Sequence, residues 1–126
     1  MQKKFLSGLV VFITGMMFFV SCSKDTVVQP TSNIPPSLKI SFNDTIQPIF
    51  TSNCSNSSCH GGTQVPNLSV GHSYSSLTTG NYINIASPTS SIIYVDMETG
   101  GIMSNHCTSA QANLVLAWIK QGALNN

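Results

Sequence analysis

The feature that most constrains this chain is a cluster of thiol and imidazole side chains within seven residues. Cys54 and Cys59 are separated by four Ser and Asn residues, and His60 follows the second cysteine directly. Two thiols so close in sequence can close a disulfide, bind a metal ion or anchor a bound group. The adjacent histidine favours a bound group, because a disulfide does not require an imidazole beside it.

The N-terminus predicts export. Two lysines precede an apolar run over residues 9–20, and a small residue, Ser21, follows. This order is typical of a secretory signal peptide, here over residues 1–21. Residues 19–22, F-V-S-C, resemble the lipobox of bacterial lipoproteins, which implies that Cys22 carries lipid. A plain signal peptide and a membrane helix are the alternatives, although the run is shorter than the ~20 residues that a bilayer needs.

Residues 22–39 predict a tether between the lipid and a folded domain. The segment is polar, contains Pro30, Pro35 and Pro36, and has no periodicity. Prolines keep such a linker extended. An ordered strand over residues 26–29 is the alternative. The folded domain is therefore expected over residues 40–126.

Large side chains are scarce in that domain. Once the predicted signal peptide is removed, Phe42, Phe50, Trp118 and three tyrosines remain. Domains this small often need a metal, disulfides or a cofactor to supplement their core. Three cysteines follow Cys22, so disulfides alone would leave one thiol over.

Charged side chains are also scarce after residue 22, where the chain has three lysines, four acidic residues and no arginine. A nucleic-acid-binding domain would need a basic surface. The composition therefore excludes nucleic acid as a partner.

The periodicity predicts helices and no sheet. Ile46, Ile49 and Phe50 share one helical face that leads to Cys54. A short helix is expected from a Ser73 cap, and another from Ser87-Pro88 to the glycines at 100 and 101. Residues 108–111 match a capping box, and the apolar stripe of the last helix consists of Leu114, Val115, Trp118 and Ile119. The predicted fold class is all-α.

The order of these segments resembles the small monohaem c-type cytochromes, in particular those of bacterial lipoproteins. The likeness covers residues 42–124. It consists of a helix running into two cysteines and a histidine, a Gly-rich loop, a short helix, the segment S-S-I-I-Y at 90–94, a methionine and a closing helix with Trp118-Ile119. The motif here is C-x4-C-H, whereas the usual spacing is C-x2-C-H.

The resemblance implies a cytochrome c-like single domain with short helices and long loops around one covalent haem c. Cys54 and Cys59 would form the thioethers, His60 would be the proximal iron ligand and Met103 the distal one. Ser104 follows the methionine, where such proteins commonly have proline. A longer Ser/Asn loop between the cysteines is expected to bulge outward while the Cys59-His60 pair stays fixed.

The function implied is electron transfer, without enzymatic activity. The expected protein is a monomer, anchored to a bacterial membrane by lipid on Cys22 and facing the periplasm or the cell surface. Its partners would be other redox proteins, which it would meet through small, transient contacts.

Several alternatives remain open from the residues alone. A haem-free lipoprotein with a Cys54–Cys59 disulfide would be a binding or structural module, and an open distal site would favour a haem enzyme or sensor. His106 competes with Met103 as the distal ligand, which would lower the potential. Cys107 has no assigned role. A zinc site would draw on the donors Cys54, Cys59, His60, His72, His106 and Cys107.

Overall fold

A computed structural model describes residues 34–126. The predicted signal peptide (1–21) and residues 22–33 of the predicted tether, with the predicted lipid site at Cys22, lie outside the described residues. No helix within residues 34–126 has the length and apolar character needed to cross a membrane.

The described part is helical and contains no strand, which confirms the all-α class for residues 34–126. The elements in chain order are the π-helix η1 (Phe42–Ile46), α1 (Gln47–Asn53), α2 (Ser73–Thr79), the 3-10 helix η2 (Pro88–Ser90), α3 (Ile92–Met97) and α4 (Ser109–Lys120).

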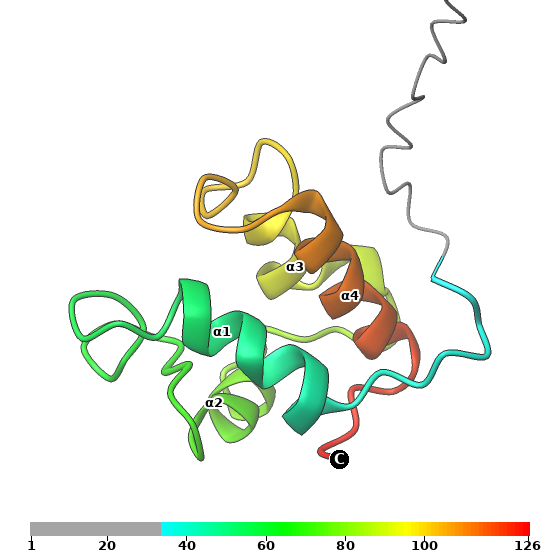
Figure 1. The fold of residues 1–126 in the computed structure, drawn as a ribbon, viewed down its shortest axis with the longest axis horizontal. Coiled ribbons are helices and arrows are strands. Elements are labelled where there is room, and N and C mark those ends of the chain that lie inside the picture. Colours follow the sequence, from blue (N-terminus) through cyan, green and yellow to red (C-terminus); the bar gives the residue numbers. More distant parts are fainter. Residues whose placement is uncertain (1–33) are drawn as a thin grey trace, which may run out of the picture.

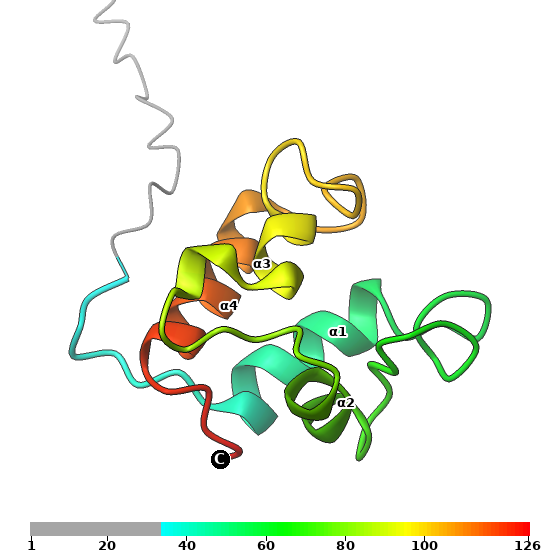
Figure 2. The ribbon, with the colours of Figure 1, turned by 180° about the vertical axis from the view of Figure 1, so that it is seen from behind.

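The first and last helical segments pack together near the chain ends. η1 continues into α1 and contacts α4, and α4 also packs along α3 (Figure 1). Two long loops, residues 54–72 and 98–108, extend from the same side of the molecule in the front view and in the view from behind (Figure 2).

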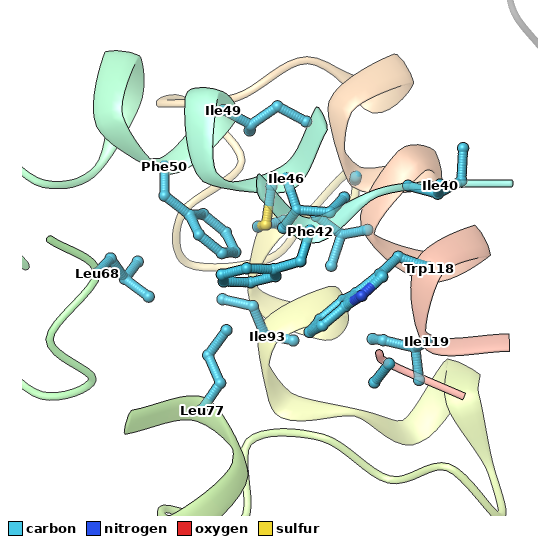
Figure 3. Close-up of a cluster of buried hydrophobic side chains, with 14 residues drawn as sticks. Ile40, Phe42, Ile46, Ile49, Phe50, Leu68, Leu77, Ile93, Trp118 and Ile119 are labelled. Atoms are coloured by element: carbon cyan, nitrogen blue, oxygen red, sulfur yellow. The ribbon is translucent and has the colours of Figure 1, made fainter. Parts of the chain in front are cut away.

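Aromatic side chains form the centre of the core. The ring of Phe42 lies 5.2 Å from that of Trp118, 5.3 Å from that of Tyr74 and 6.5 Å from that of Phe50, measured between centroids. Figure 3 shows Phe42 between Phe50 and Trp118. Trp118 is fully buried, and its indole N–H donates to the Leu124 carbonyl at 2.9 Å. Aromatic clusters of this kind add specific ring contacts to the burial of apolar area.

The two ends of the described chain are joined by hydrogen bonds. The Gln121 side chain accepts from the Ile40 N–H at 2.9 Å and donates to the Leu38 carbonyl at 2.8 Å. The Asn126 side chain accepts from the Phe42 N–H at 3.0 Å. These contacts hold the segment before η1 against the segment after α4.

Two helix starts agree with the sequence. The Ser41 hydroxyl accepts from the Asp44 N–H at 3.1 Å, and η1 begins directly after Ser41. Thr108 and Gln111 form the predicted capping box. The Gln111 N–H donates to the Thr108 hydroxyl at 3.2 Å, and the Thr108 N–H donates to the Gln111 side-chain oxygen at 2.8 Å. Both motifs depend only on local chain geometry, so they can be identified without tertiary information.

Two other predictions are wrong in detail. Ser73 lies inside α2 and does not cap it; the cap position is His72, which makes no side-chain capping bond. The predicted continuous helix from Ser87 is divided into η2 and α3 at Ser91. The buried Ser91 hydroxyl accepts from the Asn84 N–H at 2.9 Å, a tertiary contact that holds Ser91 in an extended conformation.

Candidate functional site

A cavity of about 470 Å³ lies where the two long loops face each other. Its volume falls in the range of roughly 300–1,000 Å³ that is typical of small-molecule and cofactor sites. The wall is mainly apolar, with side chains from the 54–68 loop, from α3 and from the 98–108 loop. The side chains in this wall that can donate an electron pair from sulfur, imidazole nitrogen or carboxylate oxygen are Cys54, Cys59, His60, Asp96, Met97, Met103, His106 and Cys107.

The first cysteine is positioned by α1. Ile49 and Phe50 are buried in the core, and Cys54, one turn after Phe50, is the C-cap residue. The Cys54 N–H donates to the Phe50 carbonyl at 2.8 Å, and the Cys54 carbonyl accepts from the His60 N–H at 3.1 Å. The chain therefore turns back immediately, and both Cys54 and Cys59 line the cavity.

The imidazole of His60 has a defined tautomer. Its Nδ1 lies 2.9 Å from the Pro66 carbonyl oxygen. A carbonyl can only accept, so Nδ1 carries the hydrogen and the Nε2 lone pair is available as a ligand. Ligating histidines commonly make this outer hydrogen bond, which fixes the ring orientation.

A series of hydrogen bonds between buried polar groups holds the loop of residues 54–72, called the His60 loop below, against α1 and α2. The Ser73 hydroxyl donates to the Gln47 side-chain oxygen, and the Gln47 amide donates to the Leu68 carbonyl at 3.2 Å. The Leu68 N–H in turn donates to the His60 carbonyl at 2.7 Å. Gln47 and Ser73 are 8% and 1% exposed, so these bonds are made away from water.

No pattern in the sequence predicted these hydrogen bonds as a set. The available signal was the spacing of Gln47, Phe50 and Cys54 at i, i+3 and i+7, which places the glutamine on the buried face of the first helix. A glutamine on such a face needs hydrogen-bond partners, which here come from residues far along the chain.

The 98–108 loop forms the opposite wall and is fixed by the end of α3. The Met103 N–H donates to the Asp96 carbonyl at 2.8 Å, and the Gly101 N–H donates to the Glu98 carbonyl at 2.9 Å. A Cβ on Gly101 would collide with the Val95 and Asp96 carbonyl oxygens, so only glycine permits this close approach. Met103, His106 and Cys107 all reach the cavity from this loop.

The three cysteines of residues 34–126 are free thiols. Burial raises the pKa of Cys54 to about 11, and the neighbouring Cys107 and Cys59 thiols add to this shift. Burial also raises the pKa of Cys107, whose S–H donates to the carbonyls of Met97 at 3.2 Å and Met103 at 3.4 Å. Cys54 and Cys107 are therefore neutral at pH 7 and poor nucleophiles.

The residues named as possible zinc ligands do not all meet at the cavity. His72 is the N-cap residue of α2 and is absent from the cavity wall. Within residues 34–126, no group of three or more His, Cys, Asp or Glu side chains is arranged to hold a metal ion. Met97 is 3% exposed and contributes its side chain to both the core and the wall.

Comparison of the chain with protein-family models, with curated proteins and with solved structures finds no match.

Proposed function

We propose that the chain is an electron carrier that holds one covalent haem c in a cytochrome c-like domain. The observation that carries this proposal is the composition of the cavity wall: Cys54 and Cys59, an imidazole with a free Nε2, and the Met103 thioether line one apolar space of about 470 Å³. These side chains suit a large apolar group with a central iron. A disulfide alone would require neither the imidazole and the thioether nor the apolar space.

The histidine and the methionine would bind the iron from opposite loops. The hydrogen bond from Nδ1 to the Pro66 carbonyl, at 2.9 Å, fixes the orientation of the ring and leaves the lone pair of the neutral imidazole on Nε2. Met103 would supply a soft thioether, which favours the ferrous state. When bound, haem supplies a one-electron couple between Fe(III) and Fe(II).

The thiols would make the attachment permanent. Cys54 and Cys59 would each add S–H across a vinyl double bond of the haem, with a C–S bond formed and the hydrogen taken up by the neighbouring carbon. No electrons are gained or lost, and no oxidant is needed. Permanent attachment would suit an exported protein, because a cofactor lost outside the cell cannot be replaced.

The apolar wall has a second role, which is to limit access of water. Leu68, Ile93 and Met97 are 2%, 7% and 3% exposed and all line the cavity. A poorly solvated site destabilises the more highly charged iron state and so raises the reduction potential. These side chains would thus tune the potential without touching the iron.

Export and anchoring belong to the same proposal. They rest on the sequence of residues 1–22, which predicts a signal peptide and lipid on Cys22. A lipid-anchored monomer would exchange electrons with other redox proteins at the membrane. The described surface has few charged groups, so electrostatic steering of such partners should be weak.

The test is a visible spectrum of the full-length chain, produced together with c-type haem maturation proteins. We expect a Soret band that survives acid-acetone extraction, because the thioethers hold the haem. Cys59→Ala should abolish stable retention, whereas Cys107→Ser should retain the band. A well-folded, colourless product would overturn the proposal and favour the haem-free binding module.

A further inference from the structure

The four residues between the cysteines are folded away from the cavity. Cys54 and Cys59 both line the cavity, whereas none of residues 55–58 does. Asn56, Ser57 and Ser58 are exposed to solvent. The longer spacing therefore forms an outward bulge, and the two sulfur-bearing residues remain on the inner side.

Asn56 is the centre of this bulge. Its backbone carbonyl accepts from the Cys59 N–H at 3.1 Å and from the Gly61 N–H at 2.9 Å. Its side-chain oxygen accepts from the N–H and the hydroxyl of Ser58, at 3.1 and 2.8 Å. A single residue thus receives four hydrogen bonds and closes the loop between Cys54 and Cys59.

Gly61 makes room for the bulge. A Cβ at this position would lie 2.6 Å from the carbonyl oxygens of both Asn56 and Ser55. Real Cβ atoms do not approach backbone oxygens so closely, and backbone cannot move aside as a flexible side chain can. Any residue other than glycine would push the bulge outward and separate Cys54 from Cys59.

Side chains that follow the motif also hold the bulge. The Thr63 hydroxyl donates to the Ser57 carbonyl at 2.6 Å, and the Gln64 amide donates to the Ser58 carbonyl at 3.1 Å. Gln64 also contributes to the cavity wall. The bulge is therefore held both by the hydrogen bonds to Asn56 within it and by the segment that leads to Pro66.

We propose that Asn56 is a positioning residue that brings the Cys54 and Cys59 sulfurs into register for two-point attachment of one group, despite the four-residue spacing. The identity of that group as haem rests on the proposed function. The spacing of the two sulfurs is independent of the proposed function, so the positioning role of Asn56 and the binding of haem can be tested separately.

The first experiment measures the sulfur spacing without haem. The full chain carrying Cys22→Ser and Cys107→Ser, made without haem maturation proteins, is reduced and titrated with phenylarsine oxide, whose arsenic bridges two neighbouring thiols. We expect tight one-to-one binding, weakened about tenfold by Asn56→Ala because the side-chain bonds to Ser58 are lost. Asn56→Asp keeps the acceptor oxygen and should bind like the parent chain.

Asn67→Ala is the matched control. The Asn67 side-chain oxygen accepts from the N–H and the hydroxyl of Ser69, at 3.0 and 2.6 Å, so it makes the same kind of turn outside the cysteine pair. This variant should bind the arsenical like the parent chain. Gly61→Ala should weaken arsenical binding as much as Asn56→Ala does. It would act by crowding the Ser55 and Asn56 carbonyl oxygens rather than by removing hydrogen bonds.

The second experiment counts thioethers. In chains that carry haem, alkylation of the remaining thiols shows whether one or both motif cysteines have reacted. We expect Asn56→Ala to increase the fraction with one free motif thiol, while Asn56→Asp and Asn67→Ala do not. Unchanged arsenical binding by Asn56→Ala, an equal loss in Asn67→Ala, or no two-thiol binding by the parent chain would overturn the proposal. A parent chain that binds the arsenical but takes up no haem would overturn only the proposed function.

Discussion

Around Trp118, the side chains of Phe42 and Ile119 are almost completely buried in the core. At the mouth of the cavity, by contrast, Val65 and Ile102 are 80% and 75% exposed. The first region contains the aromatic rings of Phe42 and Tyr74 and the hydrogen bonds that join the chain ends. The second consists of two loops with an apolar space between them. The first region is complete without a ligand, and the second has the apolar wall and donor groups that a bound cofactor would use.

One helix connects the two regions. α1 buries Ile49 and Phe50 in the core and ends at Cys54 in the cavity wall. The packed region thereby fixes the starting point of the loop that carries Cys59 and His60. This arrangement, a rigid scaffold that positions functional loops, is common in proteins and predicts different responses to substitution in the two regions.

The largest effect is expected in the packed region. Trp118→Ala removes the largest fully buried side chain and leaves a cavity against Phe42 and Tyr74. We expect a loss of about 3–5 kcal/mol in the free energy of unfolding, measured by urea titration of the haem-free chain. Val65→Ala, in the exposed cavity rim, should change it by about 0.5 kcal/mol or less. Equal losses in the two variants would contradict the distinction between the regions.

A smaller effect is expected where the two regions meet. Gln47→Leu removes the partner of the buried Ser73 hydroxyl and of the Leu68 carbonyl. Buried polar groups left without partners cost about 1–3 kcal/mol, which the same urea titration would detect. Gln121→Leu is the control, because the Gln121 side-chain amide likewise accepts one hydrogen bond and donates another, but Gln121 is exposed. A Gln47→Leu variant as stable as the parent chain would show that the His60 loop does not depend on this contact.

The next effect depends on pH. Since the pKa of Cys54 is raised from 9.0 to about 11, mainly by burial, the folded state retains the thiol proton in a range where the unfolded chain loses it. The stabilisation is therefore complete below pH 9 and declines as the pH rises toward 11. Because the side chain is partly exposed, we expect about 1 kcal/mol or less. The measurement is the free energy of unfolding from urea titrations of the haem-free parent and of Cys54→Ser, each at pH 8 and 10.5. The same change in this free energy between the two pH values in both chains would contradict the predicted contribution of Cys54.

The smallest effect on stability is expected at the distal ligand. Met103→Ala should leave the haem attached and change the unfolding free energy by about 1 kcal/mol or less, because the side chain is only half-buried. The visible spectrum should nevertheless lose its methionine-ligand band near 695 nm. His106→Ala is the control and should keep that band. The opposite result would assign the distal position to His106, which also lines the cavity.

Local patterns predicted much of the fold. The spacing of Ile46, Ile49 and Phe50 and the Thr108–Gln111 capping box are determined within one or two helical turns, and the structure contains both. Ser73 was misassigned because a serine before an apolar run has the same local pattern whether it caps the helix or bonds a distant residue. Its actual partner, Gln47, lies 26 positions earlier in the chain.

The site was predictable to a similar extent. Cys54, Cys59 and His60 are neighbours in sequence, so their convergence follows from one turn. That Met103 and His106 line the same cavity depends on how α3 and α4 pack, which is a tertiary feature that no local pattern encodes. The bond from His60 to Pro66 needs the specific path of the intervening loop, which no local pattern indicates.

The most direct test of the account is the intact mass of the exported chain, purified from cells with haem maturation proteins and measured under denaturing, non-reducing conditions. The account predicts a mass increased by one haem, retained after unfolding because Cys54 and Cys59 hold it covalently. A chain that carries no added haem and is lighter by two hydrogens, with Cys54 and Cys59 joined in a disulfide, would contradict it.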